Sequence, residues 1–476
     1  MRKFWIAALS GLLALVPATL PAETLTDALI AAYRNSHLLE QNQAVLRAAD
    51  EDLATAVGTL LPVISFQGSI NASGSYQPGR TTRRFDPVTN TFITVNIADQ
   101  SPLALSDSAA LIASMTLYDF GRGKLGIALR NELVLASQQS LVSVEQDVLL
   151  DAVSAYVNLQ LQGELVAAQE SNVRLIAQDL RAANDRFEVG EVTRTDVALA
   201  EAQLASANAG LASSQGAYNV ARERYKAAIG HYPSRLTGLP KWPGGVTTLA
   251  EARAIALRNH PVVLQSQHQA RAADFGVELA RTQMLPSVEG RAQLSQTFSG
   301  GTSSAINESL SITLNQTLYA GGQLSSALRR AIAQSQSAHA GLLQTGVNVD
   351  EAVGRAWSNI LVSNVSIQAG DQQIRAAQAA YDGVKQEAEL GSRTTLDVLD
   401  AEQNLLSAKA SRLQAVANLY ISQYQLLSAM GLLTARHLNL GIPTFDPNAY
   451  LNAVSRAPAT SGRGAKLDRI LKTLGK

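Results

Sequence analysis

The segment GEVTRTDVALAE, residues 190–201, returns 201 positions later as GSRTTLDVLDAE, residues 391–402. Near the start of the chain a second repeated set is offset by 224 positions instead, so the first copy holds 23 extra residues (224 minus 201). The pairs that carry these two offsets include Tyr118 with Tyr319 and Pro62 with Pro286. A repeated unit of this length is a supersecondary assembly whose apolar faces are covered by its twin or by other subunits. The sequence therefore predicts a fold built from an internal duplication.

The composition excludes several classes of partner. Lys plus Arg and Asp plus Glu both total 39, so no overall field attracts nucleic acid or an anionic membrane surface. Residues 1–22 combine a basic start, an apolar stretch and a Leu-Pro-Ala end, which is typical of a secretory signal peptide cut after Ala22. A retained membrane anchor is the alternative. The chain has no cysteine, so the exported protein holds together without disulfides and without an N-terminal lipid.

Long helices dominate the first copy. Residues 25–61 carry apolar side chains at helical spacing up to Pro62, which disfavours helix at the residue before it. Helical spacing resumes after Gly121 and continues to about Glu188, a helix near 100 Å long at about 1.5 Å per residue. Gly190 ends it. Nothing of that length packs inside an ordinary globular core.

A further helix follows in each copy. It is expected from Asp196 to Ile229, with Thr195 as its N-cap. The second copy has the same parts, with a long helix near residues 322–389 and a shorter one at residues 397–430. Two shorter helices stacked end to end match one long helix, so each copy contributes two rods of equal length.

Two stretches change to the period of a strand. Between residues 64 and 76, apolar or small side chains alternate with serine, glutamine and asparagine, which predicts one apolar and one polar face. A second alternating run at residues 109–117 follows a polar loop and completes a hairpin. The second copy repeats the hairpin with a shorter loop around residues 300–307. The 23 extra residues belong to the first loop, where insertions are tolerated.

These elements predict a domain organisation in five parts. They are a signal peptide at 1–22, a first repeat at 23–230 with a hairpin at about 63–118, a linker at 231–247, a second repeat at 248–431 with a hairpin at about 287–319, and an equatorial segment with a flexible C-terminal tail at 432–476.

Four strands per chain cannot close a membrane barrel, whose smallest single-chain form has about eight. No stretch after residue 22 reaches the roughly 18 apolar residues of a spanning helix, so entry into a membrane requires strands. Several chains must then share one barrel. A dimer offers eight strands and a trimer twelve, and this arithmetic does not choose between them. The alternative is the edge of a soluble sandwich.

The junctions between these elements resemble those of TolC-type outer-membrane efflux and type I secretion channels over nearly the whole mature chain. The motifs are Leu61-Pro62 and Leu285-Pro286, Tyr118-Asp119-Phe120-Gly121 and Tyr319-Ala320-Gly321-Gly322, the two glycine-centred turns at residues 187–197 and 390–400, and Phe445-Asp446-Pro447. The resemblance implies a mixed α and β membrane protein. In it a long α-helical coiled-coil barrel is continuous with a transmembrane antiparallel β-barrel shared by a homotrimer, four strands per chain.

The resemblance also implies a function and partners. The chain would be the exit duct of a tripartite efflux or type I secretion system in the outer membrane of a Gram-negative bacterium, with most of its length in the periplasm. Its partners would be outer-membrane lipid, a periplasmic adaptor (membrane fusion) protein and an inner-membrane RND or ABC pump. Drugs, toxic compounds and secreted proteins all fit such a duct. The alternative is a periplasmic coiled-coil structural or adaptor-like protein that never inserts.

An iris-like periplasmic gate follows from the same resemblance. Asp397 and Asp400 share a helix face and would form a cation-selective ring of six carboxylates in a trimer. The alternative, acids at a solvated helix N-terminus, explains one of the two aspartates. Arg393 would latch the gate through Thr195 or Asp196, with Ala388 replacing the family's assisting tyrosine. The adaptor would dock at the turns Val189, Gly190, Glu191 and Leu390, Gly391, Ser392, where glycine ends the helices in either interpretation.

Catalysis has no support in the sequence. Residues 121–126 fit GxGxxG, but about 65 helical residues follow instead of a compact βαβ unit. The six histidines are scattered and no cysteine is present, so no metal-ligand spacing exists. No nucleophile or acid pair stands out. We therefore expect no enzyme activity, no cofactor and no metal.

Overall fold

The computed structural model describes residues 22–74, 76–99, 103–240, 245–299, 303–454 and 469. The expected signal peptide and most of the C-terminal tail therefore lie outside the described residues. The chain divides into two compact units. The helical unit takes the described residues within 1–43, 139–264 and 345–445, and the sheet unit those within 44–138, 265–344 and 446–476.

The prediction of one continuous helix over residues 25–61 is wrong. The structure has α1 (Leu25–Asn35) and α2 (His37–Gly58), separated by Ser36 in an extended conformation with ψ 105°. The Ser36 hydroxyl accepts a hydrogen bond from the Leu39 N–H at 3.2 Å, so this serine opens the second helix as an N-cap does.

The second copy is interrupted in the same way. Helix α5 (Leu249–Asn259) ends at His260, which has ψ 124°, and α6 (Pro261–Thr282) begins at a proline. A proline disfavours helical geometry at the residue before it and is well suited to the first helical position. Both interruptions therefore have local causes that the periodicity of apolar residues does not reveal.

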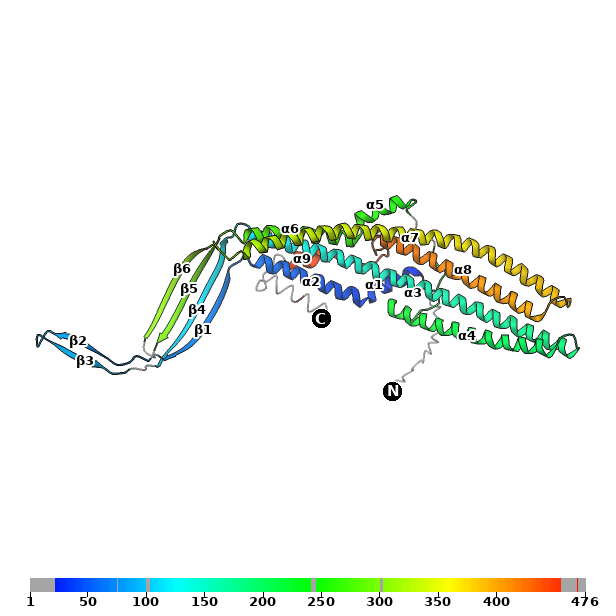
Figure 1. Ribbon diagram of the computed structural model, residues 1–476, viewed down its shortest axis with the longest axis horizontal. Helices are drawn as coiled ribbons and strands as arrows, with labels where there is room; N and C mark the ends of the chain where they lie inside the picture. Colours follow the sequence, from blue (N-terminus) through cyan, green and yellow to red (C-terminus); the bar gives the residue numbers. More distant parts are fainter. Residues whose placement is uncertain are drawn as a thin grey trace, which may run out of the picture. The chain divides into compact units, whose positions relative to one another are not determined.

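The remaining helices include two of 67 residues each, α3 (Arg122–Glu188) and α7 (Gln323–Glu389) (Figure 1). Each is followed by a turn and a shorter helix, α4 (Arg194–Ile229) after α3 and α8 (Thr395–Ala429) after α7. A short helix α9 (Pro447–Val454) lies in the sheet unit. No helix among the described residues is both long and apolar enough to cross a membrane.

The sheet unit contains a four-stranded antiparallel sheet in the order β1-β4-β5-β6 (Figure 1). Its strands are β1 (Val63–Gly74), β4 (Leu103–Tyr118), β5 (Ser287–Ser299) and β6 (Ser303–Asn315). The extra residues of the first loop form a separate two-stranded ribbon, β2 (Arg80–Asp86) with β3 (Thr91–Ile97), where the sequence predicted only a loop. In the described part of the chain, β1 pairs only with β4 and β6 only with β5, so each leaves one edge open.

The register of the sheet separates apolar from polar side chains. Leu111 of β4 stands opposite Phe66 of β1 and Leu294 of β5. The large apolar side chains of this face are exposed: Ile64, Phe66, Ile70, Leu105, Leu111, Met115, Leu294, Phe298, Ile306, Leu310, Ile312 and Leu314. The opposite face is rich in serine, and the Ser69 and Ser108 hydroxyls are 2.8 Å apart across the β1–β4 pair. One face of the sheet is thus apolar but uncovered within the chain.

The core of the helical unit lies around the middle of α3. Tyr156 is fully buried and its hydroxyl donates to the Thr237 carbonyl at 2.8 Å. The Asn35 side chain donates to the carbonyl of Ile229 at the end of α4, at 2.9 Å. Leu25 and Tyr225 are also almost fully buried. These contacts attach α1, α3 and α4 to one another and hold in place the two helices that form the first turn.

Candidate functional site

The first turn, residues 187–197 between α3 and α4, is closed by a capping box. The Thr193 hydroxyl accepts from the Asp196 N–H at 3.3 Å, and the Asp196 carboxylate accepts from the Thr193 N–H at 2.9 Å. The expectation that Thr195 caps this helix is therefore wrong, because Thr195 lies inside its first turn. A capping box needs an acid three residues after the threonine. Thr193 has Asp196 at that position, whereas Thr195 has Ala198 there.

The second turn, residues 390–400 between α7 and α8, repeats this arrangement. Asp397 accepts from the Thr394 N–H at 2.9 Å and from its hydroxyl at 2.8 Å, and these bonds lower the pKa of Asp397 below its usual value of 3.8. Asp397 is thus ionised at neutral pH. Asp400 lies one helical turn further on and is exposed. The helix N-terminus accounts for Asp397, whereas Asp400 makes no side-chain hydrogen bond to the described residues.

Arg393 forms an ion pair with a residue of α7, the helix that precedes it. Its Nε lies 2.8 Å from the Glu387 carboxylate, and both side chains are about half exposed. Asp196, one of its expected partners, is engaged by Thr193, and Thr195 is exposed. Arg393 and Asp196 nevertheless line the same hollow between the two turns, which Thr195 does not line.

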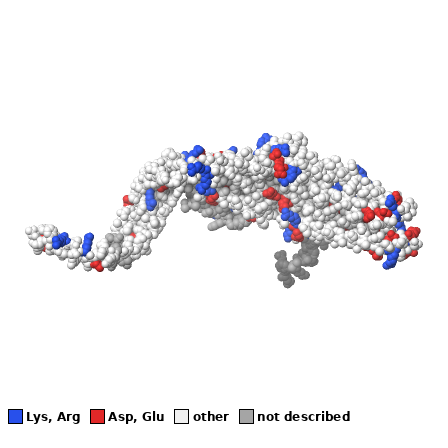
Figure 2. All heavy atoms as spheres, in the orientation of Figure 1, with Lys and Arg blue, Asp and Glu red and all other residues white. Residues whose placement is uncertain are grey.

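The residues expected to bind the adaptor lie in the two turns, between the end of one helix and the start of the next. Gly190 and Gly391 have φ of 80° and 76°, a left-handed conformation that other residues rarely adopt. Beside them Val189 is 71% exposed and Leu390 is 86% exposed. Glu191 and Ser392 are exposed as well. Figure 2 shows acidic and basic side chains gathered at this end of the helical unit.

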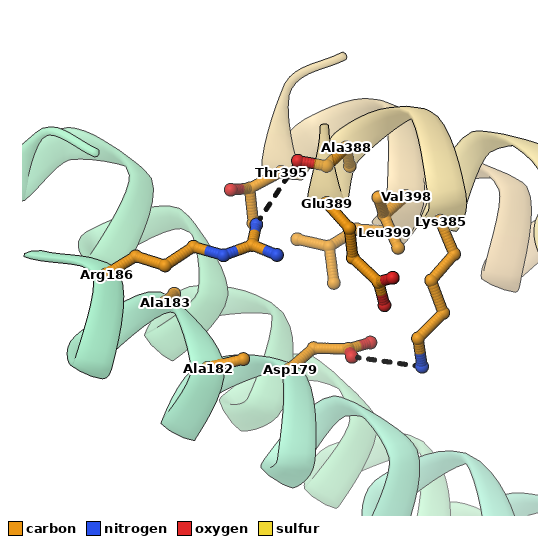
Figure 3. A pocket seen from close by; sticks show the side chains of 10 residues that line it. All are labelled: Asp179, Ala182, Ala183, Arg186, Lys385, Ala388, Glu389, Thr395, Val398 and Leu399. Atoms are coloured by element: carbon orange, nitrogen blue, oxygen red, sulfur yellow. Dashed lines mark hydrogen bonds and ion pairs between the residues drawn. The ribbon is translucent and has the colours of Figure 1, made fainter. Parts of the chain in front are cut away.

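A second hollow between α3, α7 and α8 lies beside these turns (Figure 3). Lys385 of α7 is 3.8 Å from the Asp179 carboxylate of α3, and Arg186 donates to the backbone carbonyl of Ala388 at 3.4 Å. Ala388, which stands where the resemblance implies a tyrosine, contributes only a methyl group and leaves this space open. An arginine and a lysine therefore link α3 to α7 next to the turns.

The sequence did not single out three charged residues near the second turn, Asp179, Lys385 and Glu402, of which the first two line this hollow and Glu402 does not. Asp179 and Lys385 lie 206 positions apart and neither belongs to a motif. Glu402, on α8, is only 3% exposed. It is the repeat partner of Glu201, and this pairing marks the position but not its burial. Among the described residues no group of three or more His, Cys, Asp or Glu is arranged to hold a metal ion.

Comparison with known proteins gives a consistent result. The family model described as "Outer membrane efflux protein" matches residues 29–231 and 253–432. The chain is 32% identical to the outer membrane efflux protein BepC of Brucella suis biovar 1, over 91% of each chain. It is 24% identical to the outer membrane protein TolC of Escherichia coli K12, over 76% of each chain. A crystal structure of CusC superposes with a TM-score of 0.72 at 18% identity, covering 85% of this chain and 91% of that one.

These matches confirm the resemblance seen in the sequence, and the CusC likeness confirms the class of fold, mostly helical with some strands. They place the protein in the outer membrane, with a role in export rather than in catalysis. The chain belongs to the outer membrane efflux protein family, the TolC-type channels.

Proposed function

We propose that three copies of the chain join their sheets into a twelve-stranded transmembrane β-barrel and their helices into a tunnel across the periplasm, forming the exit duct of a tripartite export system. The observation that carries this proposal is the four-stranded sheet with two open edges and an exposed apolar face. Open edges do not occur in hydrocarbon, and four strands are too few to close a barrel. Pairing of β6 with β1 of the next copy removes every open edge.

The ring proposal concerns the N-terminal turn of α8. Asp397 is ionised at neutral pH and Asp400 is exposed on the same helix face. Three copies bring six carboxylates to the narrow end of the tunnel, and such rings favour cations. Arg393 is the proposed latch. In the single chain it pairs with Glu387, and the gate closes when Arg393 exchanges this partner for Asp196, which lines the same hollow.

The partners follow from the exposed turns. Val189 and Leu390 present apolar side chains beside glycines at the end of the helical unit, which suits contact with the coiled coil of a periplasmic adaptor. An inner-membrane RND or ABC pump would load the duct through that adaptor. The family description favours efflux as the activity to test first.

Conductance across planar bilayers tests the duct and the ring together. The wild type is expected to give small cation-selective currents, and Asp397→Asn/Asp400→Asn is expected to lose the selectivity while keeping acceptors for the Thr394 cap. Asp185→Asn/Asp382→Asn removes the same number of charges from exposed positions on α3 and α7 and should leave selectivity unchanged. Arg393→Gln is expected to raise the current, and Arg194→Gln on the first turn is its control.

Each outcome of this experiment has a distinct meaning. Unchanged selectivity in the double aspartate variant keeps the duct and removes the ring. Equal currents in the Arg393 and Arg194 variants remove the latch. Failure of correctly folded wild type to insert contradicts the duct and favours a periplasmic coiled-coil protein.

A further inference from the structure

Glu402 of α8 carries a buried carboxylate without a partner. Its side chain is 3% exposed, and neither carboxylate oxygen has a hydrogen-bond partner among the described residues. A buried charge without a partner is costly, so such a group either gains a counter-charge or takes up a proton. Glu201, 201 positions earlier, is exposed on α4 and faces no such cost.

Glu402 lies where α8 packs against α3 and α7, because Leu399 packs with Ile176 of α3 and Leu405 packs with Tyr381 of α7. On α3, Asp179 has one oxygen 3.8 Å from the Lys385 ammonium and one buried oxygen without a partner in the described structure. On α7, the same Lys385 also donates to the hydroxyl of Tyr381, which is 6% exposed, at 3.5 Å. The positive charge of Lys409, also on α8, lowers the pKa of Glu402. Asp179 and Glu402 are therefore both within the field of the Lys385 ammonium. Figure 3 shows Lys385 directed at Asp179, with Arg186 and Glu389 also lining the hollow; Glu402 lies outside this lining.

We propose that Glu402, Asp179 and Lys385 form a proton-binding site that keeps α3, α7 and α8 packed beside the second turn when Glu402 is protonated and loosens them when Glu402 is ionised. A proton is the proposed ligand, because among the described residues no three His, Cys, Asp or Glu side chains are arranged to hold a metal ion and Lys385 already pairs with Asp179. This site would regulate the gate of the proposed function, and its effect on conductance rests on that proposed function.

The pKa of Glu402 has the direction this requires. Burial, and then the negative charge of Asp179, raise it from 4.5 to about 7, against the opposing effect of Lys385 and Lys409. When the helices separate, water solvates the carboxylate and the pKa returns toward its usual value. The packed state therefore binds more protons than the loosened state. Its stability is greatest at acid pH and falls as pH rises toward about 7.

Hydrogen–deuterium exchange of the full chain in detergent tests the site without reference to transport. After correction for intrinsic exchange rates, protection of residues 176–186 and 381–402 is expected to be about thirtyfold higher at about pH 5.5 than at about pH 8, because the packed state gains about a factor of ten for each pH unit below the pKa of about 7. Glu402→Gln should show the acid level of protection at both pH values. Glu201→Gln, the matched control, should keep the wild-type response.

The outcomes separate the site from the gate. A wild-type pH response in Glu402→Gln overturns the proton site. Should that variant fold poorly, Glu402→Leu must also lose the response, and a retained response there overturns the site as well. Conductance of the same variants at both pH values is then compared. The expected exchange pattern with unchanged conductance supports the proton site and overturns its role in opening, while the latch and the ring stand or fall by their own variants.

Discussion

The first turn and the second turn each contain a left-handed glycine, a threonine cap three residues later and an aspartate three residues after that. The helices that follow them differ. Six residues of α4 are buried, against thirteen of α8. Glu201 is exposed on the first helix, whereas Glu402 is buried on the second. Equal local sequence therefore produces equal caps, but the neighbours that pack against each helix decide which side chains leave the solvent.

The largest difference between the two helices is expected from their paired leucines. Leu405 of α8 is 4% exposed and packs with Tyr381 and Val398, while Leu204 of α4 is only partly buried. Leu405→Ala should cost about 3 kcal/mol of local stability and Leu204→Ala about 1 kcal/mol, because the cavity term grows with burial. Exchange protection of α8 and α4 measures both. Equal losses would show that assembly of several chains buries the two helices alike.

A smaller and symmetrical effect is expected from the caps. Thr193→Ala and Thr394→Ala each remove the hydroxyl that accepts from the third N–H of the helix, so each should cost about 1 kcal/mol. Thr195→Ala, inside the first turn of α4, should change little. Hydrogen exchange at the backbone amides of Asp196 and Asp397 measures the loss of stability in each variant. A larger loss in Thr195→Ala than in Thr193→Ala would restore Thr195 as the cap.

The smallest effect is a shared sensitivity to acid. Hydrogen bonds from Thr193 and Thr394 lower the pKa of Asp196 and of Asp397 below 3.8. The carboxylates therefore stabilise both caps above about pH 4, and this stabilisation is lost as pH falls through the lowered pKa values. Amide exchange in the first turns of α4 and α8 should rise together in this range. Asp397→Asn should remove the response in α8 alone; a response left in α8 of that variant would mean that another group causes it.

Much of the fold was readable in the sequence, because its signals are local. The long helices lie where helical spacing predicted them, since 3.6-residue periodicity and the turn glycines act within a few residues. The strands follow the alternation of apolar and polar residues in the same way. The interruptions at Ser36 and His260 were also local but were hidden by continuous apolar spacing, as was the ribbon of β2 and β3 in a polar loop.

The candidate site also contains residues that local sequence revealed and residues that only the packing revealed. The turn residues were found in the sequence, and a stricter use of the capping box would have chosen Thr193 over Thr195. The cluster of Asp179, Lys385 and Glu402 was not found, because no motif joins positions on three separate helices. A helix and its cap depend on neighbours in the chain. Burial of a charge depends on which helices pack around it, and that packing is a long-range property.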